Sequence, residues 1–239
     1  MKIAVINFSG NVGKSTIARH LLQPRVQGAE LITIESTNAG EDSSDQTLRG
    51  SQFGALQEYL QTVETAVVDV GASNVEELLE LMRKYRGSHE DFDYFVVPTV
   101  PALKQQRDTI ATLAELQQIG VPAAKLKLVF NMLDEDLDLP QTFEPLFAFL
   151  HEYRAATADV RCCLQANELF GRMKRMQSDT PADLAALARD ETDFKALIAR
   201  ATTVEEKITL AQAPSTRRLA RGVLPELDAC FAALELTPA

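Results

Sequence analysis

The stretch that decides the fold is Lys2–Leu22, which reads KIAVINFSGNVGKSTIARHLL. Its apolar run, Ile3–Ile6, predicts a buried strand, and a turn follows at Phe8–Thr16. Beyond the turn, apolar side chains recur at helical spacing; they are Ile17, Ala18, Leu21 and Leu22. The stretch therefore predicts a strand, a glycine-bearing loop and a helix N-terminus in direct succession.

This succession is typical of a loop that binds phosphate. Glycines let the backbone approach the ligand, and the N–H groups and dipole of the helix start favour an anion. Lys14 is expected to reach the β- and γ-phosphates, and the Ser15 hydroxyl to hold Mg²⁺. The usual pattern, G-x-x-x-x-G-K-[ST], has a glycine where this chain has Phe8. A chance Gly-Lys-Ser-Thr at a helix start is the alternative, but the flanking strand and helix are the context that the motif requires.

Length and composition set the class of protein. The 239 residues, 46% of them hydrophobic, suffice for one large α/β domain with a sizeable core. No apolar run approaches the ~20 residues that cross a bilayer, and the start does not have the layout of a signal peptide, so we expect a cytoplasmic protein. The formal charge of −10 and pI of about 4.9 argue against global attraction to DNA.

The cysteines and histidines indicate no metal centre. Cys162, Cys163 and Cys230 form no C-x-x-C pair and are interpreted as small apolar groups. The three histidines, His20, His89 and His151, are scattered along the chain and are interpreted as ordinary surface or core residues.

A second candidate site element follows the predicted strand Thr65–Asp69. Asp69 ends an apolar run and Gly71 comes two residues later, so the carboxylate is expected to bind Mg²⁺ and the glycine backbone to approach the γ-phosphate. The alternative is a helix cap, because Ser73 or Asn74 begins a helical pattern. Both interpretations can hold together.

Further strands are predicted at Glu30–Glu35, Phe95–Val97, Leu126–Phe130 and Val160–Leu164. Pro98 and Pro101 are expected to end the strand at Phe95–Val97, before a long helix at Leu103–Ile119. Asn131 follows the next strand, where its amide is expected to bind a base or, as the alternative, to make a turn.

The rest of the pattern is a polar loop and a helical tail. Ser36–Gly50 is predicted to be a loop near the site, and a last helix is expected over roughly Thr216–Leu234. Arginines gather at the start of that helix, where they indicate either a solvated face or a weak contact with DNA or a partner; they are Arg217, Arg218 and Arg221.

Several of these motifs together resemble those of the ParA/MinD family of partition and positioning ATPases. Ser9–Ser15 is similar to that family's deviant phosphate loop, K-G-G-x-G-K-[ST], and the elements Val67–Gly71, Val96–Pro101 and Leu128–Asn131 occur in the family's order. The resemblance covers Met1 to about Phe170 and is strongest to the StbB subgroup, the plasmid-stability proteins of conjugative plasmids.

The resemblance implies an α/β fold of the P-loop NTPase type (SIMIBI-like), with a mostly parallel sheet, helices on both faces and a helical C-terminal extension. One domain, 1–239, is expected, with a core at about 1–170 and a helical tail at about 180–239. It also implies ATP and Mg²⁺ as cofactors, a nucleotide-dependent homodimer and a plasmid-encoded DNA-binding partner. Association with the nucleoid through that partner is compatible with this, and direct contact with DNA stays open.

Residue roles carry over in the same way. Lys14 and Asp69 are the implied catalytic residues, Ser15 and Asp69 the implied metal ligands, and Thr16 lies near the α-phosphate while Asn131 faces adenine. The implied nucleotide-binding set is Ser9, Gly10, Asn11, Val12, Gly13, Lys14, Ser15, Thr16, Gly71 and Asn131.

Two departures from the family pattern concern hydrolysis. The signature lysine that reaches the partner subunit's phosphates would fall at Ser9, which is short and neutral. The D-x-D of the first switch would fall at Glu35 and Thr37, and Glu41 or Asp42 is a candidate substitute. The resemblance thus implies an ATP-driven switch in plasmid stability, partition or DNA positioning, and the two departures favour slow or partner-stimulated hydrolysis. A nucleotide-dependent adaptor that scarcely hydrolyses and a P-loop small-molecule ligase or kinase are the alternatives.

Overall fold

The computed structural model describes residues 1–34, 50–175 and 183–237. Two compact units divide the chain: the first is Met1–Gln165 with Ala229–Ala239, and the second is Ala166–Asp228. The first unit holds the sheet and every candidate site residue named above that the structure describes. The single-domain assignment remains a prediction.

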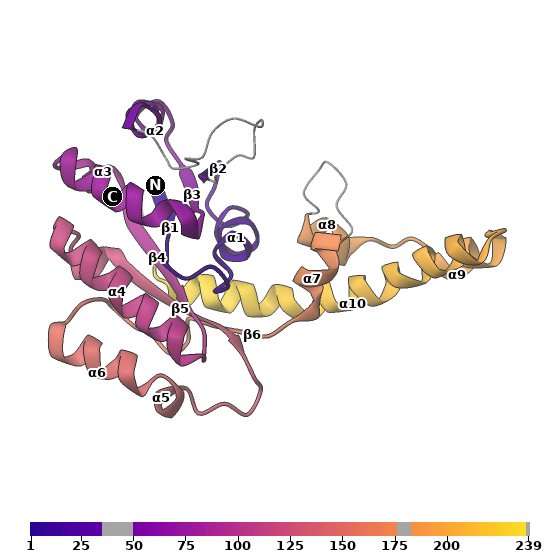
Figure 1. The fold of residues 1–239 in the computed structure, drawn as a ribbon. Helices are drawn as coiled ribbons and strands as arrows, with labels where there is room; N and C mark the ends of the chain where they lie inside the picture. Colours follow the sequence, from indigo (N-terminus) through magenta and orange to yellow (C-terminus); the bar gives the residue numbers. More distant parts are fainter. Residues whose placement is uncertain (35–49, 176–182, 238–239) are drawn as a thin grey trace. The chain divides into compact units, whose positions relative to one another are not determined.

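The first unit is built on a six-stranded sheet in the order β2-β3-β1-β4-β5-β6, with every pairing of these strands parallel (Figure 1). The strands are β1 (Lys2–Val5), β2 (Glu30–Ile34), β3 (Ala66–Val70), β4 (Tyr94–Thr99), β5 (Leu126–Leu133) and β6 (Cys163–Gln165). The predicted α/β fold with a parallel sheet and a helical C-terminal part is therefore confirmed.

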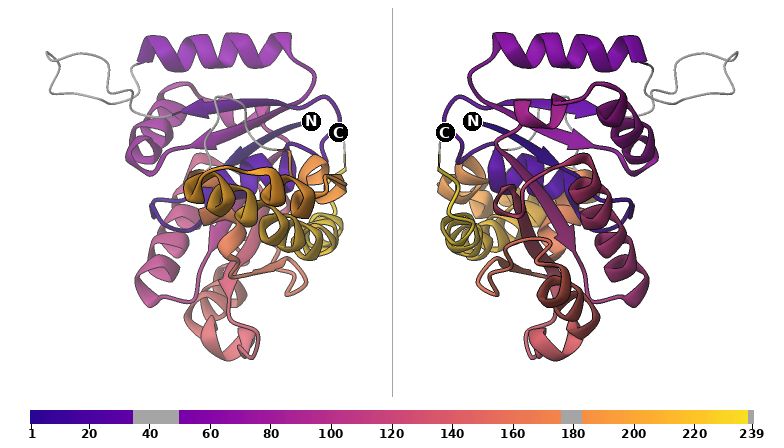
Figure 2. Two further views of the ribbon diagram at one scale, coloured as in Figure 1. Left: turned by 90° about the vertical axis from the view of Figure 1, so that its right-hand side faces the viewer. Right: turned by 90° about the vertical axis from the view of Figure 1, so that its left-hand side faces the viewer.

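Helices cover both faces of this sheet because its central strands are apolar on both sides (Figures 1 and 2). Alternate strand residues such as Ala4, Val68 and Phe95 join one core cluster with apolar residues of four helices: α2 (Gly50–Thr62), α3 (Val75–Lys84), α4 (Leu103–Ile119) and α6 (Glu144–Tyr153). The intervening residues, such as Val5 and Val67, lie on the opposite face. That face carries the short helix α1 (Lys14–Thr16) and the π-helix η1 (Ile17–Leu22).

One predicted boundary is wrong for a local reason. Pro98 does not end its strand but lies inside β4, paired in register with Val129. The Ile6 N–H donates to the Val96 carbonyl, so Val96 and Pro98 both face β1. Because β1 has ended by that level, the N–H group that proline lacks has no strand neighbour to bond.

Helix ends follow the sequence more closely. Gly120 closes α4 with a φ of 105°, as its position after the predicted helix implied. Asn74 occupies the N-cap of α3, but its side chain makes no cap and donates instead to the Ile34 carbonyl. The remaining short helices of this unit are η2 (Ala72–Asn74), η3 (Ser88–Asp91), η4 (Ala123–Lys125) and α5 (Leu139–Thr142).

The second unit is helical. It contains α7 (Glu168–Arg175), α8 (Leu184–Arg189), α9 (Phe194–Arg200) and most of α10 (Val204–Ala233). The last helix begins well before the predicted Thr216, and Pro214 and Pro225 both lie inside it. No helix in the described parts of the chain combines the length and the apolar character that crossing a membrane demands.

The arginines of α10 have an intramolecular role that neither sequence interpretation anticipated. Arg217 donates to the Asp190 carbonyl oxygen at 2.7 Å, and Arg221 donates to the Ala188 carbonyl oxygen at 2.7 Å. Both acceptors lie at the C-terminal end of α8, where carbonyl groups lack helical partners. These two side chains therefore hold α8 against α10 within the second unit.

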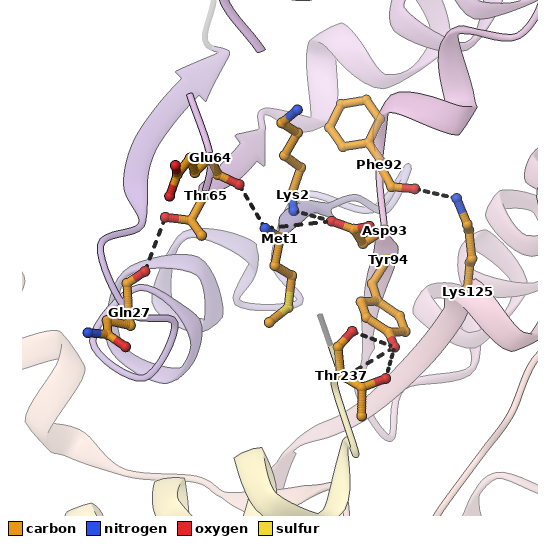
Figure 3. A network of polar contacts seen from close by, with 10 residues as sticks. All are labelled: Met1, Lys2, Gln27, Glu64, Thr65, Phe92, Asp93, Tyr94, Lys125 and Thr237. Carbon is orange, nitrogen blue, oxygen red and sulfur yellow. Dashed lines mark hydrogen bonds and ion pairs between the residues drawn. The ribbon is translucent and has the colours of Figure 1, made fainter. Parts of the chain in front are cut away.

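Polar contacts fasten the sheet at the edge where its strands begin (Figure 3). The Met1 ammonium group donates to the Glu64 carbonyl oxygen at 2.7 Å, and the Lys2 N–H donates to Asp93 at 2.6 Å. The Tyr94 hydroxyl lies 3.3 Å from the carbonyl oxygen of Thr237 and accepts from its N–H at 3.2 Å. These contacts fix the starts of β1 and β4 and tie the chain's last described residue to them.

Candidate functional site

The loop between β1 and α1 forms the centre of the candidate site. It leaves the carboxyl end of the sheet's strands and turns into the helix through Gly13, which has a φ of 85° and a ψ of 27°. The Ile17 N–H bonds to the Gly13 carbonyl oxygen at 2.9 Å, so helical bonding starts directly at the loop. The N–H groups of this first turn face the loop without helical partners, as an anion site requires.

Lys14 lies inside this loop rather than in solvent. Its side chain is buried, and Nζ donates to the Asn7 carbonyl oxygen at 3.0 Å and to the Ser9 carbonyl oxygen at 2.6 Å. Burial lowers the pKa of Lys14 to about 8, and the charge of Asp69 opposes this shift. The loop thus encloses an ammonium group held by two neutral acceptors, which a phosphate can replace.

Asp69 lies on the strand next to β1 and directly across from Val5 in the register. Its side chain is buried, at 3% exposure, and its charge acts on Lys14. The segment after it is close to the loop as well, because a Cβ placed on Gly10 would be 4.0 Å from the Ala72 Cβ. The structure therefore brings the predicted second element beside the first.

Gly71 connects this second element to the neighbouring strand. Its N–H donates to the Ile34 carbonyl oxygen at 2.8 Å, and the buried side chain of Asn74 donates to the same oxygen at 3.1 Å. Ile34 is the last described residue before the first switch of the family pattern. Both bonds therefore join the segment after β3 to the end of β2.

Asn131 belongs to the same edge of the sheet. It is buried in β5, and its Nδ2 donates to the Val12 carbonyl oxygen at 2.9 Å. It also lies so near Gly13 that a Cβ at that position would overlap its amide nitrogen. The amide thus contacts the loop between β1 and α1, and its predicted contact with adenine stays a prediction.

The remaining loop residues differ in their exposure. Val12 is buried, Thr16 is half-buried, and Gly10, Asn11 and Ser15 are exposed. The Ser15 hydroxyl is therefore accessible at the helix start. Hydroxyl and carboxylate oxygens are ligands that Mg²⁺ accepts together with phosphate oxygens and water, so Ser15 and Asp69 fit this ion in the presence of a nucleotide.

No group of three or more His, Cys, Asp or Glu side chains is arranged to hold a metal ion among the residues that the structure describes. The residues Glu35, Thr37, Glu41 and Asp42, which the family pattern places near hydrolysis, lie outside the described residues.

The sequence interpretation missed three polar residues that support the loop. Asn7, Thr109 and Thr112 are all fully buried, and each bonds to the loop or to a residue that does. The available signal was a polar residue, Asn7, at the end of the first apolar run and two threonines within the predicted helix Leu103–Ile119. The sequence alone does not show that these residues are in contact, because the bonded positions lie about a hundred residues apart in the chain.

Comparisons with known proteins give structural neighbours only. No family model matches the sequence, and no curated protein sequence matches it. The chain is similar to a variant of McdA from Cyanothece in complex with ATP, with 11% identity, a TM-score of 0.45 and coverage of 99% of this chain and 98% of that chain. It is also similar to apo McdA from Cyanothece, with 12% identity, a TM-score of 0.47 and coverage of 98% and 97%. Values this low do not transfer an activity, so the functional argument rests on the site's own residues.

Proposed function

We propose that this protein binds Mg-ATP in the loop between β1 and α1 and works as a nucleotide-dependent switch of the ParA/MinD type. The observation that carries the proposal is the buried ammonium group of Lys14, held by two loop carbonyl oxygens at a helix start. Anionic phosphate oxygens are stronger partners for an ammonium group than neutral carbonyls are. Nucleotide binding would exchange these partners without moving the loop far.

The neighbouring residues support the same ligand. The Gly13 backbone turns the chain into the helix, and the accessible Ser15 hydroxyl and the carboxylate of Asp69 are the groups that would hold Mg²⁺. Bound Mg²⁺ would neutralise charge on the β- and γ-phosphates. Asp69 lies near the end of β3 and Gly71 directly follows that strand, and this position supports a role for the segment in responding to the γ-phosphate.

Hydrolysis is proposed to be slow or dependent on a partner. Ser9, which stands where the family has its signature lysine, is 5% exposed, and its main chain is already bonded within the loop. A short, neutral and buried side chain cannot supply positive charge to the phosphates of a second subunit. The same observation favours the second candidate, an adaptor that docks a partner when ATP is bound and scarcely hydrolyses it.

The cellular role proposed is plasmid stability, partition or DNA positioning, and it rests on the resemblance alone. A nucleotide-dependent homodimer and a plasmid-encoded DNA-binding partner belong to this proposal. The formal charge of −10 makes indirect DNA contact, through that partner, the favoured arrangement. Phosphate release measured with and without DNA and the partner separates an active switch from an adaptor, and gel filtration with Mg-ATP tests the dimer.

A crystal structure of the complex with Mg²⁺ and a slowly hydrolysed ATP analogue tests the site directly. The proposal expects Lys14 Nζ to leave the Asn7 and Ser9 carbonyls for the phosphates, with the metal beside Ser15. A nucleotide bound elsewhere, with Lys14 still on both carbonyls, would refute it. Ser15→Ala is expected to weaken Mg-ATP binding more than binding of ATP without metal.

A further inference from the structure

Buried polar contacts join the start of the phosphate loop to helix α4. The side chain of Asn7, which is fully buried, accepts from the Ser9 N–H at 2.7 Å through Oδ1. Its Nδ2 donates in the other direction, to the Pro98 carbonyl oxygen and to Thr109 Oγ1, both at 2.8 Å. One side chain therefore fixes the loop to the end of β4 and to α4.

Two threonines on α4 form the other side of this network. Thr112 Oγ1 accepts from the Phe8 N–H at 3.1 Å and donates to the Asp108 carbonyl oxygen at 2.7 Å. Thr109 Oγ1 accepts from Asn7 and lies 2.8 Å from the Gln105 carbonyl oxygen. Both threonines are fully buried, and each would still bond within its own helix if the loop were absent. The bonds that the two threonines accept from Asn7 and Phe8 are therefore not required to satisfy their hydroxyl groups within α4.

The loop atoms fixed in this way are the ones beside the atoms that hold Lys14. The Asn7 carbonyl accepts from Lys14 Nζ while the Asn7 side chain is held by α4. The Ser9 carbonyl accepts from Nζ while the Ser9 N–H is held by Asn7. The position of the ammonium group therefore depends on main-chain atoms whose orientation the α4 network sets.

We infer that Asn7, Thr109 and Thr112 are positioning residues of the nucleotide site, and that α4 sets the conformation of the phosphate loop through them. The inference rests on the proposed function. Removing the Thr112 hydroxyl leaves the Phe8 N–H without its acceptor in a part-buried setting, so the loop must shift to satisfy it. A loop that has shifted holds Lys14 less well and binds phosphate more weakly.

The test compares isosteric and conservative substitutions with a matched control. Thr112→Val removes the hydroxyl at nearly constant volume, and Thr112→Ser keeps it. Thr216→Val is the control, because Thr216 is also buried on a helix and bonds to a carbonyl four residues earlier, at Gln212, but lies in the second unit. Mg-ATP affinity is measured by calorimetry, melting temperature by calorimetric scanning, and exchange of the Phe8 amide by NMR.

We expect Thr112→Val to weaken Mg-ATP binding by about tenfold, the size of one lost hydrogen bond, and to speed exchange of the Phe8 amide. Thr112→Ser restores both, whereas Thr216→Val lowers the melting temperature without changing affinity. If wild-type protein binds Mg-ATP and Thr112→Val binds it equally well, with unchanged amide exchange, the inference fails and the proposed function stands. If wild-type protein binds no nucleotide, both fall. Asn7→Ala provides an independent variant, for which the same loss of affinity is expected.

Discussion

The amide nitrogen of Asn131 donates a 2.9 Å hydrogen bond to the carbonyl oxygen of Val12, which lies 119 residues earlier in the chain. Through this bond β5 holds the middle of the loop between β1 and α1 from one side. The Asn7 network holds the start of the loop from α4. The loop that contains Lys14 is thus fixed from two elements, and its conformation does not depend on glycine content alone.

Replacing Asn131 by aspartate tests this bond. A carboxylate cannot donate to the Val12 carbonyl and places a negative charge beside it, so we expect a loss of roughly 1–3 kcal/mol in the free energy of unfolding. Urea denaturation monitored by circular dichroism measures it. Asn11→Asp makes the same chemical change at an exposed position of the same loop and is expected to cost little. If both variants lost the same free energy of unfolding, the bond from Asn131 to Val12 would not account for the effect of Asn131→Asp.

Gly13→Ala tests the close approach of β5 to the loop. Alanine at this position would have to adopt the left-handed backbone conformation of Gly13, which is strained for a residue with a side chain. Its Cβ would also overlap the Asn131 amide. Gly87 has a similar φ of 89° and open space around its Cβ position, so Gly87→Ala measures the conformational strain alone, ~1–2 kcal/mol. We expect Gly13→Ala to be clearly more destabilising in urea denaturation. Adding Asn131→Ala to Gly13→Ala is expected to relieve the overlap, and no relief would contradict the geometry.

The lowered pKa of Lys14 predicts a pH dependence of nucleotide binding. The ammonium form is needed for phosphate, and burial brings its pKa to about 8, so the free protein loses this charge as the pH rises above about 8. Affinity for Mg-ATP is then expected to fall by up to about tenfold per pH unit above that value, since one proton must be taken up on binding. Calorimetric titrations between about pH 7 and about pH 9.5 would give the slope, because this range begins about one unit below that pKa and ends about one and a half units above it.

The control for this pH dependence is Lys14→Met, which has no titrating group. It is expected to bind weakly and with an affinity independent of pH over the same range. The free energy of unfolding changes with pH in the opposite direction. In the unfolded chain the lysine pKa returns to 10.5, so above about pH 8 the unfolded chain binds more protons than the folded protein does. The free energy of unfolding is therefore expected to rise between about pH 8 and pH 10.5. If the affinity of the wild-type protein for Mg-ATP did not change over the pH range of the titrations, the Lys14 side chain would not lose its charge in that range.

The edge of the sheet opposite the loop supplies a prediction about stability alone. Asp93 accepts from the Lys2 N–H and lies 3.8 Å from the Met1 ammonium group, so it fastens the start of β1 (Figure 3). Asp93→Ala is expected to lower the free energy of unfolding by about 1–2 kcal/mol, since the lost bond has a charged acceptor. Glu90→Ala, an exposed neighbour with the same change of charge, is expected to cost much less. Nucleotide affinity should be unchanged in both.

The fold was largely predictable because its strands are short apolar runs separated by helical patterns. Ile3–Ile6 and Thr65–Asp69 match β1 and β3 to within one residue at each end. Pro98 was misjudged because its tolerance inside β4 depends on β1 ending at the same level, which is a fact about a neighbouring strand. The apolar stripe indicated only the part of α10 from about Thr216 onward, whereas the helix begins at Val204.

The candidate site was predictable only in part. The local motif identifies Gly13, Lys14 and Ser15, because glycine, lysine and hydroxyl at that spacing have a direct chemical purpose. The strand-end rule adds Asp69 and Asn131. It does not reveal that Asn131 bonds to the loop, nor that Asn7 bonds to Thr109, because these contacts depend on how α4 and β5 pack against β1.

The central claim is that Lys14 and its loop bind the phosphates of Mg-ATP. Calorimetric titration of Mg-ATP into the wild-type protein, Lys14→Ala and Lys84→Ala tests it most directly, because Lys84 is an exposed lysine at the far end of α3. The account predicts one binding site in the wild type and in Lys84→Ala, and a loss of at least about a hundredfold in Lys14→Ala, the size of a buried charge-assisted contact. No heat of binding in the wild type, or equal binding by all three proteins, would contradict it.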